Sequence, residues 1–186
     1  MGYTHYWYTD LTIVTPERFA ALGKDAARLF DVAATEGIVV VREYDRPGTR
    51  PEIGELTIRF NGLGDDGGHE TFSFDARPNV RPEGAEPTKD FWADDLTDEE
   101  RRIGGAWWRY NKVVEAGNVR WTFCKTSRKP YDAVVCALLM RAKVVLGAGI
   151  RVTSDGYFDS DWGPGRDLYL IAYGEDGPSP IEPDEE

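Results

Sequence analysis

The stretch VRWTFCKTSRKPYDAVVCALLMRAKVVL, residues 119–146, reads as a strand, a turn and a helix in succession. Residues 119–125 alternate as a half-buried strand does, with Val119, Trp121 and Phe123 on one face. After Pro130 the apolar residues recur at helical spacing, and Gly147 ends that pattern. The chain is therefore expected to pass from a sheet to a helix through residues 125–130.

The segments around this stretch predict further strands and one more long helix. Strands are expected at residues 3–9, 56–60, 71–75 and 150–153, and residues 38–41 favour an interior strand covered on both faces. Thr15 and Pro16 begin a helix that Gly37 ends. Residues 168–172 fit either a strand or a helix. Together the elements predict an α+β fold, with a single mixed, mostly antiparallel sheet and two main helices packed on one face.

The length of 186 residues predicts one domain. We expect residues 1–174 to form it, with residues 78–118 as an insertion or excursion. Within that segment the tryptophans of residues 92–118 are expected to dock the chain on the core. Residues 175–186 are acidic and contain prolines, so a flexible tail is expected there.

The composition excludes several classes of protein. A formal net charge of -11 argues against general binding of nucleic acid or of anionic membrane, because both repel an acidic chain. The two cysteines, Cys124 and Cys136, form neither a disulfide framework nor a CxxC metal motif. No signal segment and no long apolar run is visible, so a cytoplasmic location is expected.

The turn at residues 125–130 is the best candidate for an anion site. Its polar residues are basic or carry a hydroxyl: Lys125, Thr126, Ser127, Arg128 and Lys129, with Arg120 upstream. A helix start offers unpaired N–H groups, and arginine grips a phosphate with two hydrogen bonds. The alternative is a solvated turn whose cations pair with the acidic surface.

Aromatic residues suggest how such a ligand would be held. Tyr3, Tyr6, Trp7 and Trp121 are candidates to stack a base while the turn holds a phosphate. Most of the aromatic residues are nevertheless expected to belong to the core.

Three weaker candidates concern acid–base or metal chemistry. His69 and Glu70 lie at the end of the glycine-rich loop 61–70 and are the catalytic candidates if the protein is an enzyme; the alternative is a flexible hairpin tip. Asp155, Asp159 and Asp161 are weak metal candidates, although tight turns use the same residues. His5, in an aromatic strand, is expected to be a satisfied core residue.

Several short motifs resemble an uncharacterised family of small bacteriophage and actinobacterial proteins. The motifs are GYTHYW at residues 2–7, FNG at 60–62, HETF at 69–72, FCKT at 123–126 and RKPYD at 128–132, with SDG at 154–156 and Trp162. The resemblance brings no established activity with it. It implies a phage context, in which small proteins often counter host defence, some by sequestering nucleotide signals.

The sequence thus favours a binding protein for a small anionic, nucleotide-type ligand over an enzyme. Two alternatives stay open. One is a metal-assisted hydrolase or phosphodiesterase acting on such a ligand. The other is a protein-interaction module, either a homo-oligomer or an inhibitor of a host enzyme, anchored by Trp107 and Trp108. No cofactor is indicated by a motif.

Overall fold

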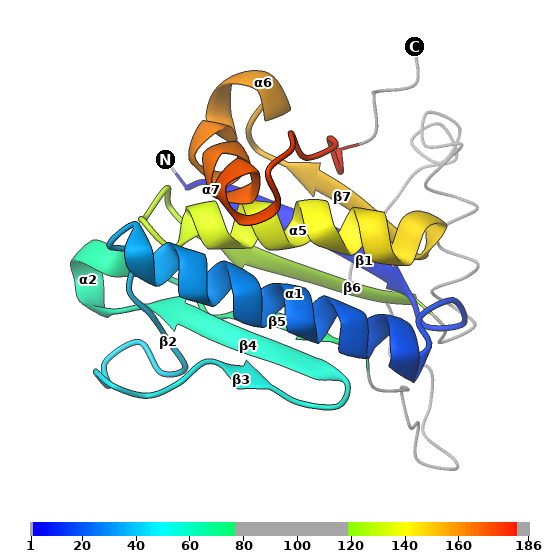
Figure 1. The fold of residues 1–186 in the computed structure, drawn as a ribbon, viewed down its shortest axis with the longest axis horizontal. Coiled ribbons are helices and arrows are strands. Elements are labelled where there is room, and N and C mark those ends of the chain that lie inside the picture. The colour runs from blue at the N-terminus through cyan, green and yellow to red at the C-terminus, as the bar shows by residue number, and fades with distance from the viewer. Residues whose placement is uncertain (1, 77–118, 182–186) are drawn as a thin grey trace, which may run out of the picture.

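The structure, a computed structural model, describes residues 2–76 and 119–181 and has an α+β fold (Figure 1). Along the chain the elements are β1 (Thr4–Asp10), α1 (Pro16–Thr35), β2 (Val40–Val41), β3 (Glu52–Ile53), β4 (Thr57–Gly62), α2 (Gly64–Gly67), β5 (Phe72–Asp75), β6 (Val119–Lys125), α5 (Asp132–Leu146), η1 (Gly147–Gly149), β7 (Ile150–Ser154), α6 (Phe158–Asp161) and α7 (Gly163–Tyr173). The predicted excursion at residues 78–118 and the end of the tail at 182–186 lie outside the described residues.

The described strands form two antiparallel sheets, so the prediction of a single sheet is wrong. One sheet has the order β6-β1-β7. In the other, β4 pairs with β2, β3 and β5, and Phe60 lies opposite Phe72 as the predicted hairpin requires. The predicted strands at β1, β4, β5, β6 and β7 are confirmed.

The two sheets meet where β5 runs beside β6, and several hydrogen bonds at this junction come from side chains. The Glu70 N–H donates to the Lys125 carbonyl at 3.2 Å, but the Lys125 N–H donates to the Glu70 carboxylate at 2.9 Å. At the other end, Arg120 donates to the Asp75 carbonyl and pairs with the Asp75 carboxylate at 2.8 Å. At both ends of this seam, the junction of β5 and β6, a side chain therefore bonds to the backbone of the neighbouring strand.

The hydrophobic core extends across the junction of the two sheets, beneath the helices. Trp7 of the first sheet stacks on Phe72 of the second, with ring centroids 4.9 Å apart, and also lies over Phe74. Helices α1, α5 and α7 pack against one another, and Figure 1 shows α1 and α5 covering one side of the strands. The expected packing of the two main helices on one face is therefore observed, with α7 added beside α5.

Helix α1 begins for the reason read from the sequence, whereas α5 begins at Asp132, two residues after Pro130, without a side-chain cap. The Thr15 hydroxyl accepts the Arg18 N–H at 3.3 Å, and Pro16 occupies the first turn of α1. One side of α1 is then buried in the core along its whole length, through Phe19, Leu22, Ala26, Leu29 and Ala33. The undecided segment at residues 168–172 belongs to α7.

One other expectation is not met. Residues 38–41 do not form an interior strand: β2 has two residues, pairs with β4, and leaves Val39 55% exposed. The first part of the acidic tail lies against the protein, because Ile181 forms a parallel bridge with Val152 and Gly177 approaches Met140 and Tyr169 closely. Among the described helices, none is both long and apolar enough to cross a membrane.

The seam predicts a measurable role for the Glu70 carboxylate. Replacement of Glu70 by alanine leaves the Lys125 N–H without its acceptor, and we expect the free energy of unfolding to fall by about 1–3 kcal/mol. Glu70→Gln keeps an acceptor oxygen and should lose less. Urea unfolding measures both variants, and Glu55→Ala, at an exposed position, is the control. A Glu70→Ala protein as stable as the control would contradict this role.

Candidate functional site

The basic turn is tied to the start of β1 by its backbone. The N–H groups of Thr126 and Ser127 both donate to the Tyr3 carbonyl, at 2.9 and 3.1 Å. Ser127 and Arg128 adopt φ values of 52° and 58°, in the left-handed region that favours glycine. Two such residues in succession store strain, which the hydrogen bonds to Tyr3 hold in place.

Arg128 is already engaged within the protein. Its guanidinium lies 4.2 Å from the centroid of the Tyr3 ring and forms an ion pair of 2.6 Å with Asp161. The second oxygen of Asp161 accepts the Tyr157 N–H at 2.9 Å. This N–H and then Arg128 lower the pKa of the Asp161 carboxyl below its usual range. Arg128 thus joins the turn to α6, and an anion would have to displace Asp161.

The start of α5 does not offer the unpaired N–H groups that the sequence suggested. Asp132 N–H donates to the Lys129 carbonyl at 2.8 Å, and the next two residues continue in the same way, Ala133 to Pro130 and Val134 to Tyr131. The Asp132 carboxylate also lies in the first turn, where a negative charge complements the helix dipole. Lys125 and Lys129 are therefore the cations of the turn for which the described residues supply no ion-pair partner.

An exposed aromatic cluster lies beside this turn, on the face of the first sheet opposite to Trp7. Tyr6 and Phe123 are paired across β1 and β6, and Trp121 precedes Phe123 by two residues on the same face. The ring centroids of Trp121 and Phe123 are 5.2 Å apart, and Tyr6 stacks with Trp121 at 6.4 Å. Trp121 and Phe123 are 47% and 45% exposed. We call Tyr6, Trp121 and Phe123 the aromatic face.

The structure thus brings Tyr6 and Trp121 together, as the stacking hypothesis requires, but not Trp7. Trp7 is buried on the other face of β1, where it packs on Phe72 and Phe74. Phe123 was missing from the proposed ligand-binding set. The alternation of residues 119–125 already placed it on the face of Trp121, so the signal was available in the sequence.

His69 and Glu70 lie at the seam and hold the end of β6. His69 Nδ1–H donates to the Lys125 carbonyl at 3.0 Å. The Glu70 carbonyl accepts the Tyr131 hydroxyl at 2.6 Å, and its carboxylate accepts the Lys125 N–H. Both residues thus shape the backbone from which the basic turn departs. Cys124 beside them is fully buried, and burial raises the pKa of its thiol to about 12, which keeps it protonated.

The three weak metal candidates do not gather. Asp161 pairs with Arg128, Asp155 accepts the Tyr6 hydroxyl at 3.4 Å, and the side chain of Asp159 is 96% exposed. The cluster with metal-ligand geometry in the described part of the chain consists of other residues, His5, Asp132 and Cys136.

His5 is a satisfied core residue, as expected. Its ring is fully buried; Nε2–H donates to Asp132 at 2.8 Å, and the Ser154 hydroxyl donates to Nδ1 at 3.0 Å. Serine, histidine and aspartate in this order resemble a hydrolytic triad. However, the Ser154 oxygen already accepts the Gly156 N–H at 3.1 Å and the Trp162 indole N–H at 3.4 Å. The arrangement is that of a buried network rather than of an exposed nucleophile.

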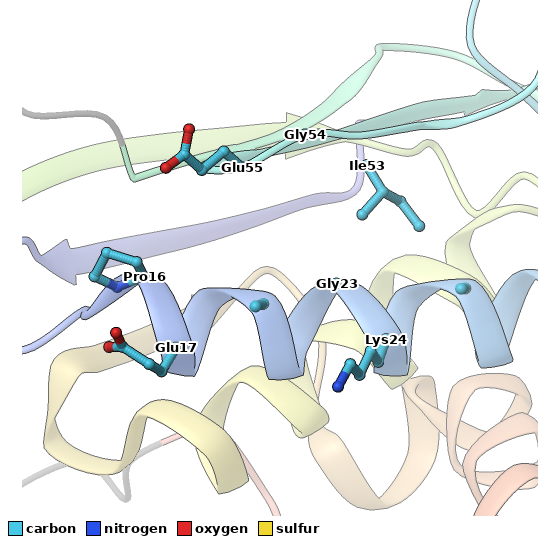
Figure 2. A pocket seen from close by; sticks show the side chains of 9 residues that line it. Pro16, Glu17, Gly23, Lys24, Ile53, Gly54 and Glu55 are labelled. Carbon is cyan, nitrogen blue, oxygen red and sulfur yellow. The ribbon is translucent and has the colours of Figure 1, made fainter.

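A shallow groove of about 620 Å³ lies elsewhere, between α1 and the β3–β4 turn. Figure 2 shows Lys24 and Gly23 on the helix side and Ile53 on the strand side. None of the residues predicted from the sequence to bind a ligand lines this groove. The groove is the competing location for a ligand.

Comparison with known proteins gives no family. No protein-family model, no curated protein and no solved structure matches the chain. The resemblance to small phage proteins therefore stays a prediction.

The strained turn predicts an unusual stabilising substitution. Glycine adopts positive φ without the steric cost borne by Ser127, so Ser127→Gly should raise the free energy of unfolding by roughly 0.5–1 kcal/mol. Ser73→Gly, in the extended backbone of β5, is the matched control and should lower it by a similar amount. Chemical denaturation of both variants gives the signs. Destabilisation by Ser127→Gly equal to that of the control would argue against the left-handed turn.

Proposed function

We propose that this protein binds a small ligand that carries an aromatic ring and an anionic group, of which a nucleotide is the simplest example. The ring would stack on the aromatic face, and the anion would pair with Lys125. The observation that carries the proposal is the exposed cluster of Tyr6, Trp121 and Phe123 beside that lysine.

Strand geometry supports the pairing of ring and charge. Trp121, Phe123 and Lys125 occupy alternate positions of β6 and share one face, so Lys125 lies about 6–7 Å along the strand from Phe123. This spacing is on the scale of the sugar that separates a base from its phosphate. Stacking of a base on an exposed aromatic side chain contributes about 1–3 kcal/mol and tolerates different bases.

The electrostatic setting favours a small ligand over a polymer. Lys125 has no carboxylate partner among the described residues, whereas Arg128 is paired with Asp161. Lys129 adds a second cation on the same turn. The net charge of -11 repels the extended phosphate backbone of DNA or RNA, but a single phosphate interacts only with its immediate surroundings.

Binding without turnover is preferred to hydrolysis for this proposal. His69 and Glu70, suggested for a metal-assisted reaction, bond to the backbone of Lys125 at the junction of the sheets. The suggested metal ligands Asp155, Asp159 and Asp161 do not form a cluster. The interaction-module alternative depends on Trp107 and Trp108, which lie outside the described residues. In the phage context that the resemblance implies, the proposed activity would be the sequestration of a nucleotide signal.

Native mass spectrometry with a panel of linear and cyclic nucleotides tests the proposal. We expect intact capture of at least one nucleotide, and calorimetry then gives its affinity. Trp121→Ala should weaken binding by roughly 5–150-fold through lost stacking. Lys125→Ala should weaken binding and reduce its dependence on salt concentration.

Lys24→Ala is the matched control, because Lys24 lines the groove of Figure 2 and not the aromatic face. Unchanged affinity in Lys24→Ala together with losses in the other two variants supports the proposal. The opposite pattern would move the ligand to the groove. Recovery of nucleotide fragments would favour the hydrolase, and no capture by the panel would contradict the proposal.

A further inference from the structure

A nitrogen, an oxygen and a sulfur ligand converge beneath α5. His5 comes from β1, and Asp132 and Cys136 lie four residues apart on one face of α5. His5 Nε2 is 2.8 Å from the Asp132 carboxylate and 3.6 Å from Cys136 Sγ. All three ligand atoms lie within 4.8 Å of one another.

We propose that His5, Asp132 and Cys136 form a binding site for a divalent ion of the zinc type. Zinc accepts imidazole, carboxylate and thiolate together and prefers a tetrahedron. From its bond lengths, the nitrogen and sulfur ligands of such a site stand about 3.6 Å apart, the separation found between His5 and Cys136. Nitrogen and oxygen stand about 3.4 Å apart, so the Asp132 carboxylate has to move by roughly half an ångström.

The Tyr3 hydroxyl is a second and independent indication of a ligand here. Tyr3 is 3% exposed, and its hydroxyl oxygen is buried without a hydrogen-bond partner. Its ring stands edge-on to that of His5, with centroids 5.0 Å apart. The hydroxyl oxygen lies against Gly156, whose N–H donates to the same Ser154 oxygen that contacts His5 Nδ1. Such an orphaned polar group is uncommon in a folded protein and is explained if an ion or its water lies beside it.

The surroundings support His5 as a ligand. Metal-bound histidines usually donate the other ring N–H to a neighbouring group, which fixes the ring. Ser154 already lies 3.0 Å from His5 Nδ1, and the Trp162 ring packs edge-on against the imidazole at 4.9 Å. A shift of the ring proton from Nε2 to Nδ1 frees Nε2 for the ion. Nδ1–H then donates to the Ser154 oxygen in place of the longer of the two N–H donors that this oxygen now accepts, the Trp162 indole.

Access and charge are consistent with an exchangeable ion. The Asp132 side chain is 13% exposed, so one ligand reaches solvent while the other two are buried. Burial raises the pKa of the Cys136 thiol, and the positive charge of the ion opposes that effect. Binding releases the thiol proton to solvent. The ion would join β1 to α5 across 127 positions of sequence and should stabilise the fold.

Cobalt substitution in the untagged, full-length protein tests the site. After treatment with chelator and reductant, Co²⁺ is added and the thiolate-to-cobalt absorption band is recorded. The chain has two cysteines, so one variant of each assigns the band. We expect one Co²⁺ per chain, a band that Cys124→Ser keeps and Cys136→Ser loses, and displacement by Zn²⁺. No thiolate band, or a band lost in Cys124→Ser, would overturn the proposal.

Zinc titrations of the same variants add an affinity and a stability readout. Cys136→Ser should bind Zn²⁺ more than about 100-fold more weakly, and Ser154→Ala about 10–100-fold more weakly. Zn²⁺ should raise the melting temperature of the unsubstituted protein and of Cys124→Ser, but not of Cys136→Ser. If Cys136→Ser does not fold, Asp132→Asn replaces it, since that carboxylate is partly exposed. An equal rise in all variants would contradict the site.

Discussion

The hydrogen bonds of His5 set the register of β1, on which both faces of the first sheet depend. His5 is fully buried and is bonded to Asp132 on α5 and to Ser154 on β7. Because side chains alternate along a strand, a shift of one residue would move His5 and Trp7 out of the core and Tyr6 into it. The network beneath the helices therefore also fixes the aromatic face on the outside, opposite Phe123.

The basic turn depends on the same strand and on the hairpin beside it. The Tyr3 carbonyl receives two N–H groups of the turn, while His69 and Glu70 hold both backbone groups of Lys125. The aromatic face and its adjacent cations are thus positioned by contacts from three separate segments of the chain. A rigid platform of this kind loses little conformational entropy when it binds a ligand, which favours capture of a small molecule.

Local patterns predicted most of the described elements, because their causes are local. The alternation of apolar and polar residues predicted β6, and Thr15 with Pro16 predicted the start of α1. The division into two sheets was not predictable in this way, since the contacts at their junction, such as that of the Lys125 N–H with the Glu70 carboxylate, join residues 55 positions apart. The pairing of Arg128 with Asp161 and the meeting of His5 with Cys136 join residues far apart in sequence. Spacing alone does not reveal such contacts. For this reason the sequence did not predict that Arg128 of the basic turn is already paired with Asp161.

A ligand that stacks on the outer face of β1 and β6, as we propose, would change the NMR signals of the tryptophan there. We would label the indole nitrogens and follow them by NMR during titration with a mixture of 5′-mononucleotides. We expect the Trp121 signal to shift with saturation, while those of the buried Trp7 and Trp162 keep their positions. An unmoved Trp121 signal in a protein saturated with nucleotide would contradict it.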